Sequence, residues 1–369
     1  MARPRLKSLD CTGRDGKLVV SIDPRQRVEL DDPDGHVRLL LQLAAEGSRE
    51  TGALIAEFTR VRPEVPAADV AQALESLDGF GWIEDLDRPA ALDDTQRERY
   101  FSNLAFFDAF TSLGRGREDI QDRLVRSHVL VLGAGGLGSH VVQHLAGLGV
   151  GRLTIVDFDV VDLRNFARQF TYTPSQLGNS KVHQVAAWVS AFDPAVTVRP
   201  VHRRVETTAD VEDLLTGVDL VVGAIDQPEG IDLTINAACV AAGVPYIRGG
   251  LAYLQGVYWS VDPGRSACRQ CLETRRAREL AADAGAHAVT WPEVLRRDRV
   301  NRAIGPVAGM LGALVAMEVL RYLTGIVPPV SAATYQLVDF RSDCHLSVDA
   351  WTAEPGCPVC ATAFTKAPR

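Results

Sequence analysis

The 369-residue sequence lacks several features that mark secreted, membrane or repetitive proteins. No apolar segment follows the basic start MARPRLKSLD, so we expect no secretory signal peptide. The longest apolar stretch, 304–323, is interrupted by glycine, proline and charged residues, which predicts a mostly buried helix and no membrane span. Internal repeats and low-complexity tracts are also missing. We therefore expect a soluble, cytoplasmic protein.

Positive charge is scarce, because 39 Lys and Arg face 47 Asp and Glu and leave a formal net charge of −8. This balance argues against general binding to nucleic acid or to anionic membranes. Hydrophobic residues at 46% and charged residues at 23% are ordinary globular values. The length suits one large α/β domain and one smaller domain.

Residues 17–86 have the pattern of a small α+β domain. KLVVSIDPRQRVELDD predicts two strands around a turn, and HVRLLLQLAAEG and RETGALIAEFTR predict two helices. ADVAQALESLDGFGWIEDL then predicts a third helix and a closing strand. This order is typical of a winged-helix-like domain, and the polar linker DRPAALDDTQRER follows it. We therefore predict a small domain at 1–90 and a large domain at 91–369.

The large domain alternates strands with helices. SHVLVLGAGGLGSHVVQHLAGLGVGRLTIVDFD predicts a strand, a glycine-rich turn, a helix and a second strand. Strand-like runs continue with VTVRPVH, DLVVGAID, VPYIRGGL and GVYWSVDP, then with TYQLVDF and CHLSVDAW near the end. The alternation predicts a Rossmann-like mixed or parallel sheet with helices on both faces.

The glycine-rich turn predicts a nucleotide site. Its glycines, which permit a tight turn and let backbone N–H groups approach a phosphate, are Gly133, Gly135, Gly136 and Gly138. Asp157 ends the second strand, where an acceptor for ribose hydroxyls is expected. By itself this pattern fits NAD, FAD and ATP equally well.

A set of polar residues beyond the second strand narrows the choice to adenylation. Its members are Asp159, Asn165, Arg168, Gln169, Lys181 and Asp226. A hydride-transfer site has little use for such a set. In contrast, attack at an α-phosphate builds negative charge that Arg168 and Lys181 can stabilise. Asp226 ends a later strand, where it is positioned to hold Mg²⁺ against the phosphates.

Two Cys-x-x-Cys pairs predict a metal site. The pairs are Cys268 with Cys271, and Cys357 with Cys360, and a long stretch separates them. In a chain without a signal peptide, this spacing favours metal over disulfides. Four thiolates complete a tetrahedral Zn²⁺ site and leave no open position, so we expect a structural zinc.

The sequence between 129 and 194 resembles the ThiF/MoeB/HesA-type adenylyltransferases of the ubiquitin-activating-enzyme superfamily. The family pattern GxGGxG, DxDxVxxxNxxRQ, GxxK and a strand ending in Asp is matched, in order, by GAGGLG, DFDVVDLRNFARQ, GNSK and GAID. The resemblance covers about residues 99–361. It implies ATP with its ribose at Asp157, Mg²⁺ at Asp226, structural zinc at the two cysteine pairs and a homodimer. It also implies phosphate contacts from Asn165, Arg168, Gln169 and Lys181.

The sequence departs from the sulfur-carrier and ubiquitin activators in one respect. Those enzymes often carry a nucleophilic cysteine after the first zinc pair, but 272–303 contains none. Cys11 falls in a polar N-terminal tail, and we expect Cys239 and Cys344 to pack in an apolar helix and a late strand. We therefore predict direct transfer of the adenylated group. Ser102 replaces an arginine of the family's N-terminal motif, which leaves the source of an arginine finger open.

ERYFSNLAFFDAF and the Asp-x-Pro after the fourth strand resemble the microcin-C-type (MccB-like) adenylating enzymes of peptide natural-product biosynthesis. Those enzymes carry a small PqqD-like domain that binds the leader of a ribosomal precursor peptide by strand addition. The resemblance implies the same role for residues 1–90. Dimerisation or DNA binding are alternatives, and the acidic stretches ELDDPDGH and ESLDGFGWIEDLD make DNA the weaker one.

The sequence thus predicts ATP-dependent adenylation of a carboxylate or amide on a ribosomally made precursor peptide, with release of pyrophosphate. The activated group would pass to an amide, an amine, a thiol or a downstream modifying enzyme. Two alternatives stay open: adenylation of a diglycine-ending sulfur-carrier protein, and a non-catalytic leader-binding partner of a cyclodehydratase. The retained Arg168, Lys181 and Asp226 argue against the second alternative.

Overall fold

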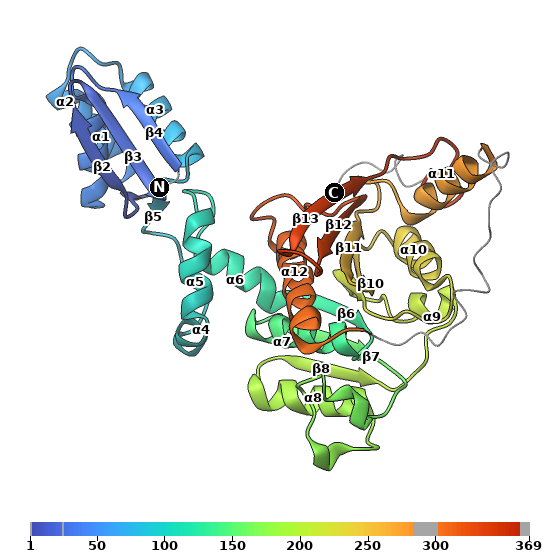
Figure 1. The fold of residues 1–369 in the computed structure, drawn as a ribbon. Coiled ribbons are helices and arrows are strands. Elements are labelled where there is room, and N and C mark those ends of the chain that lie inside the picture. The colour runs from blue at the N-terminus through green and yellow to red at the C-terminus, as the bar shows by residue number, and fades with distance from the viewer. Residues whose placement is uncertain (1, 24–25, 283–301, 362–369) are drawn as a thin grey trace. The chain divides into compact units, whose positions relative to one another are not determined.

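The computed structural model describes residues 2–23, 26–282 and 302–361 (Figure 1). The chain forms two compact units that divide between residues 122 and 123. The two units share no sheet, and each is described separately.

The first unit holds two small antiparallel sheets and a set of helices. Its strands are β1 (Pro4–Leu6), which pairs with β5 (Ile83–Asp85), and β2 (Asp10–Arg14), β3 (Lys17–Asp23) and β4 (Gln26–Asp31), with β3 in the centre. Its helices are α1 (His36–Glu46), α2 (Thr51–Val61), α3 (Ala67–Gly79), α4 (Asp94–Arg99) and α5 (Phe101–Phe107). Alternate residues of β3, Leu18 and Val20, are buried against leucines of α1 and α3. The predicted strands, three helices and closing strand are present, whereas β1 and β2 were not predicted.

Residues 91–122 group with the first unit, whereas the sequence prediction assigned them to the large domain at 91–369. Lys7 Nζ donates to the carbonyl oxygens of Asp108 and Thr111 at 2.9 and 3.0 Å. Asp78 Oδ1 accepts from Leu113 N at 2.6 Å. These long-range hydrogen bonds tie the segment that follows the expected boundary at residue 90 to the small sheet and its helices.

The second unit is built on an eight-stranded mixed sheet, as the sequence predicted (Figure 1). The strand order is β13-β12-β11-β10-β9-β6-β7-β8. The neighbouring strands β10, β9, β6, β7 and β8 run parallel to one another. The neighbouring strands β10, β11, β12 and β13 are antiparallel. Their bounds are β6 (His128–Leu132), β7 (Arg152–Val156), β8 (Thr197–Val201), β9 (Leu220–Gly223), β10 (Tyr246–Ala252), β11 (Gln255–Val261), β12 (Thr334–Asp339) and β13 (His345–Ala350).

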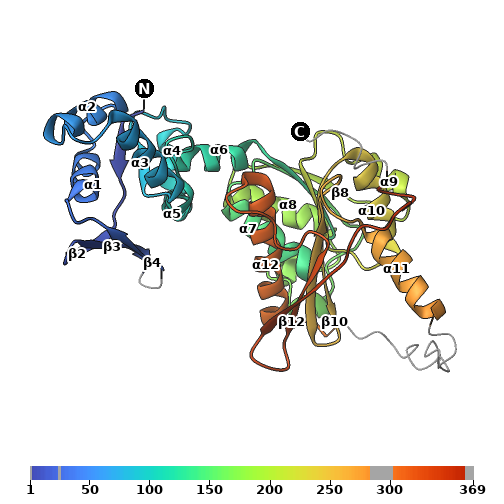
Figure 2. The same cartoon turned by 90° about the horizontal axis from the view of Figure 1, so that it is seen from above.

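Helices cover both faces of this sheet, since the crossovers from β6 run in opposite directions (Figure 2). The helices are α6 (Arg117–Arg126), which spans the division between the units, and α7 (Gly136–Gly147), α8 (Lys181–Phe192), α9 (Thr208–Glu212), α10 (Ile231–Ala242), α11 (Arg269–Ala282) and α12 (Gly305–Thr324). Among the described residues, α12 alone has the length and apolar composition of a membrane span. It packs on α7, β10 and β11, and 56% of its most apolar window is buried, which accounts for its composition.

The strand order creates a crevice beside β6. The chain leaves β6 for β7 on one side, whereas β9 pairs with β6 on the other. In open α/β sheets, ligands bind outside the carboxyl ends of the strands at such a reversal. The turn after β6 and the segment after β9 therefore face the same space.

Candidate active site

A cavity of about 700 Å³ lies at the carboxyl ends of the parallel strands. Its apolar wall includes Leu137, Val205 and Leu311. Its charged lining consists of six cations and three carboxylates: Arg168, Lys181, Arg203, Arg204, Arg248 and Arg302, with Asp157, Asp159 and Asp226. This excess of positive charge, in a chain of net charge −8, suits a polyanionic ligand such as a nucleoside triphosphate.

The glycine-rich turn after β6 leads into α7 at the edge of the cavity. Gly133 has φ 105°, and a Cβ there would lie 2.6 Å from the carbonyl oxygen of Ala224. Gly135 is the N-cap of α7 and has no side chain to cap the first N–H groups of that helix. Gly133, Gly135 and Gly136 line the cavity. The uncapped helix N-terminus is therefore available to bind phosphate.

Asp157 is fixed by two backbone amides. Its Oδ2 accepts from Ala134 N at 2.7 Å and its Oδ1 accepts from Asp159 N at 2.8 Å. Tyr172 donates its hydroxyl to the carbonyl oxygen of Ala134 at 2.8 Å, and burial with the nearby Asp157 charge raises the pKa of this phenol, which stays protonated. The carboxylate is thus held in one orientation at the cavity wall.

Lys181 is the first residue of α8 and its side chain is only 6% exposed. Its Nζ donates to Asp159 Oδ2 at 2.9 Å, and its backbone N donates to the carbonyl oxygen of Asp159 at 3.0 Å. Both side chains line the cavity. A buried ammonium with a half-exposed partner carboxylate is placed to contact an anionic ligand.

Arg168 and Gln169 enter the cavity from the segment after β7. Within the described part of the chain, Arg168 Nε and Gln169 Oε1 are buried without a hydrogen-bond partner. Buried polar atoms of this kind point to a ligand, because leaving them unpaired is costly. The segment is anchored by His140 of α7, whose Nε2 donates to the carbonyl oxygen of Arg168 at 3.2 Å.

Not every predicted residue reaches the cavity. Asp226 lines it, but Gly138 and Asn165 do not. Asn165 Oδ1 accepts from Asp162 N at 2.9 Å in a local cap. Gly138 serves the turn instead, because a Cβ there would lie 1.9 Å from the carbonyl oxygen of Gly133.

The sequence interpretation missed four of the six cations, namely Arg203, Arg204, Arg248 and Arg302. Arg248 lies in β10 and is 8% exposed, so a charged residue inside an apolar strand was the available signal. Arg204 lies 4.7 Å from the ring centroid of Phe158, which is 44% exposed at the cavity wall.

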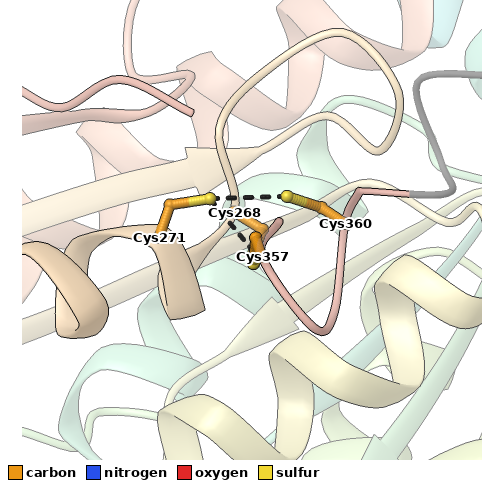
Figure 3. A group of neighbouring side chains, drawn as sticks. All are labelled: Cys268, Cys271, Cys357 and Cys360. Atoms are coloured by element: carbon orange, nitrogen blue, oxygen red, sulfur yellow. Dashed lines mark hydrogen bonds between the residues drawn. The ribbon is translucent and has the colours of Figure 1, made fainter. Parts of the chain in front are cut away.

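The four cysteines of the two pairs are brought together (Figure 3). Their sulfur atoms all lie within 4.8 Å of one another, with Cys268 at 3.7 Å from Cys357 and Cys271 at 3.4 Å from Cys360. A disulfide needs about 2.05 Å. In contrast, four sulfurs at about 2.3 Å from one tetrahedral zinc lie about 3.8 Å apart. The donor set and its spacing therefore fit zinc.

The other cysteines follow the predictions in part. Cys239 is buried in α10, as expected. Cys344 is exposed, with φ 61°, in the turn between β12 and β13, so its expected packing role was wrong. Cys11 is exposed on β2. Of the cysteine-free segment 272–303, residues 283–301 lie outside the described part of the chain.

The family model of the ThiF family matches residues 107–359, and the chain belongs to this family of ATP-using adenylyltransferases. It is an enzyme, and it is similar to the SAMP-activating enzyme E1 of Haloferax volcanii, at 31% identity over 73% of this chain and 91% of that protein. It is also similar to the sulfur carrier protein ThiS adenylyltransferase of Escherichia coli, at 31% identity over 66% of this chain and 89% of that protein.

The fold is that of MccB from E. coli. The two structures superpose with a TM-score of 0.74 at 18% identity, over 97% of this chain and 96% of MccB. MccB bound to AMPCPP and MccA gives a TM-score of 0.71 at 18% identity, over 97% of this chain and 99% of MccB. The shared fold thus extends over nearly the whole chain.

Proposed function

We propose that this enzyme adenylates a carboxylate or amide on a ribosomally made precursor peptide that its N-terminal unit binds. One observation carries the proposal: the combination of an adenylyltransferase unit with a preceding α+β unit is shared, over 97% of the chain, with MccB, which has been solved with MccA. Among the described strands, β2 and β4 each pair on one side only. Such edges can accept an added peptide strand, so a PqqD-like role for residues 1–90 is consistent with this sheet.

The cavity residues supply the chemistry of the proposed reaction. An oxygen of the peptide attacks the α-phosphorus of ATP, the bond from that phosphorus to the bridging oxygen breaks, and pyrophosphate leaves. Arg168 and Lys181 stabilise the charge that develops, and the N–H groups at the start of α7 hold phosphate. Asp157 accepts from the ribose. Asp226 would hold Mg²⁺, which neutralises phosphate charge when bound.

We further assign a structural Zn²⁺ to Cys268, Cys271, Cys357 and Cys360, which joins the start of α11 to the segment after β13. A homodimer, a downstream modifying enzyme that takes the activated group and a cytoplasmic location complete the proposal. Each of these follows from the resemblance or from the sequence pattern.

A second function is favoured by a specific observation. Relatives at 30–31% identity carry the names molybdopterin-synthase adenylyltransferase and sulfur carrier protein ThiS adenylyltransferase. A small carrier protein with a diglycine end would then be the acyl donor at the same cavity.

ATP–pyrophosphate exchange on the full chain separates the two functions. We expect stimulation by a synthetic precursor peptide, chosen from any short reading frame that lies beside this gene, and none by a diglycine-ending carrier protein. Asp226→Ala should abolish exchange, while Glu229→Ala, an exposed acid outside the cavity, should leave it unchanged. Stimulation by the carrier alone would favour the second function. No exchange with either donor would count against both.

A further inference from the structure

Arg248 is a cavity cation whose position is set by other residues. Its Nη1 donates to the carbonyl oxygen of Gly223 at 2.7 Å, and its Nε donates to Asp232 Oδ1 at 2.6 Å. Gly223 ends β9, just before the segment that carries Asp226 to the cavity. Arg248 is thus bonded to the end of β9 and is also one of the residues that line the cavity. Asp232, in the first turn of α10, is the partner carboxylate of this nearly buried charge.

The same carboxylate faces a second arginine. Asp232 Oδ2 lies 3.8 Å from Arg269 Nε, and Arg269 follows directly after Cys268. The Arg269 side chain is 11% exposed, packs 5.6 Å from the ring centroid of Trp259 and pairs with Glu273. Because it is nearly buried, this guanidinium has little freedom to move apart from the backbone at Cys268.

A side chain of α10 also binds the backbone directly after Cys268. Asn236, one turn beyond Asp232, accepts from Arg269 N at 2.8 Å and from the Tyr246 hydroxyl at 2.9 Å. The carbonyl oxygen of Cys268 accepts from Trp351 Nε1 at 3.1 Å, on the segment that leads to Cys357. Helix α10 therefore carries both the carboxylate that pairs with Arg248 of the cavity and the amide that binds the backbone next to Cys268.

We infer that metal occupancy of the cysteine cluster and nucleotide binding in the cavity are coupled through Asp232. A metal at the cluster fixes Cys268 and hence Arg269, and Arg269 helps to fix the carboxylate that orients Arg248. Asp232 is a positioning residue, since it acts on the ligand through Arg248. The inference rests on the cavity being the ATP site proposed above.

Coupling between two sites is reciprocal, so it can be measured at the metal without any turnover. The test follows the rate at which a chromophoric chelator removes zinc from the full zinc-loaded chain, with and without saturating ATP. We expect ATP to slow zinc removal by about fivefold or more in the unaltered protein. In Asp232→Asn, ATP at a concentration that saturates this variant should slow zinc removal by less than about twofold, because the link between the cavity and the cysteine cluster is lost.

A matched control is Glu212→Gln, which neutralises an exposed carboxylate on α9, the helix packed against α10. It should retain the full effect of ATP. Calorimetric titration should also show an ATP Kd raised about tenfold in Asp232→Asn and unchanged in Glu212→Gln. The kcat should fall less than KM rises, since Asp232 contacts no reacting atom.

Two outcomes would overturn the inference alone: zinc removal from the unaltered chain that is indifferent to bound ATP, or an undiminished ATP effect in Asp232→Asn. A chain that fails to bind ATP would overturn the assignment of the cavity as well. If circular dichroism shows that Asp232→Asn does not fold, the unaltered chain still tests whether the two sites are coupled. Arg269→Lys is then the second variant that tests the route between them.

Discussion

Residues that line the cavity, and the segments beside it, are held by hydrogen bonds between side chains and backbone groups. Asp157 accepts from Ala134 N, Tyr172 donates to the carbonyl oxygen of Ala134, and His140 donates to that of Arg168. Groups fixed in this way need little rearrangement when charge develops on a substrate. Asp157 and Arg168 could be predicted, because they belong to a motif that is contiguous in the sequence. The anchoring role of His140 could not, because it depends on tertiary packing.

Arg168→Gln should lower the rate of ATP–pyrophosphate exchange by about 100-fold to 1,000-fold, because a cation that stabilises the developing phosphate charge is lost. The matched variant is Arg164→Gln, four residues earlier, whose side chain is 90% exposed and pairs only with Asp162 among the contacts described. Arg164→Gln should retain nearly full activity. Equal losses in the two variants would point to a general effect of positive charge on this segment.

His140 should make stability depend on pH. Burial lowers the pKa of its imidazole below the ordinary value of 6.5, which outweighs its hydrogen bond to Arg168. At pH values between 6.5 and the lowered pKa, the imidazole binds a proton in the unfolded chain but not in the folded chain. The contribution of His140 to the free energy of unfolding is therefore complete above pH 6.5 and decreases as the pH falls below it.

The thermal midpoints of the unaltered chain and of His140→Gln measure this effect between pH 7.5 and 5.5. The stability advantage of the unaltered chain over His140→Gln should shrink as the pH falls across this range, because the folded chain disfavours the protonated imidazole. A stability difference that stays constant with pH would contradict the prediction.

At the scale of elements, the turn from β6 into α7 depends on how closely backbones approach. The sequence predicted this turn, its helix and the strands of the large sheet, because glycine spacing and strand alternation are local signals. The cations from β10 and from the segment after β8 could not be predicted in the same way. Their place in the cavity depends on the strand order, which puts β9 and then β10 on one side of β6, and β7 and then β8 on the other.

Gly138→Ala should destabilise the chain by about 1–3 kcal/mol and weaken ATP binding, since its methyl group would overlap the carbonyl oxygen of Gly133. At Gly147, at the other end of α7, an added Cβ would have no neighbouring heavy atom within 4 Å outside its own helix turn and chain neighbours. Gly147→Ala should therefore stabilise the chain by about 0.4–1 kcal/mol. Chemical denaturation of both variants measures the difference. A neutral Gly138→Ala would mean that the turn can move away from its neighbour.

The whole molecule combines a negative net charge with a cavity lined mainly by cations. The composition gives the negative net charge and argues against general polyanion binding. It could not predict the cation-lined cavity, because the arginines that line it are far apart in the sequence. The division between residues 122 and 123 was also beyond the composition, because the ties from Lys7 and Asp78 to the segment after residue 90 are long-range.

Raising NaCl from about 50 mM to about 500 mM should weaken ATP binding several-fold, because salt screens attraction between the cavity and the triphosphate. Adenosine carries no phosphate and should bind with the same affinity at both salt concentrations. Calorimetric titration of both ligands provides the comparison. A parallel loss for adenosine would indicate that salt acts on the fold.

The cysteine cluster also changes the connectivity of the chain. A metal between Cys268 and Cys357 would join residues 89 positions apart, and the closed ring would contain α11, α12, β12 and β13. After a single protease cut within this ring, the two pieces would be held by the metal in addition to the strand pairing of the sheet. Their separation would then require a chelator as well as a denaturant.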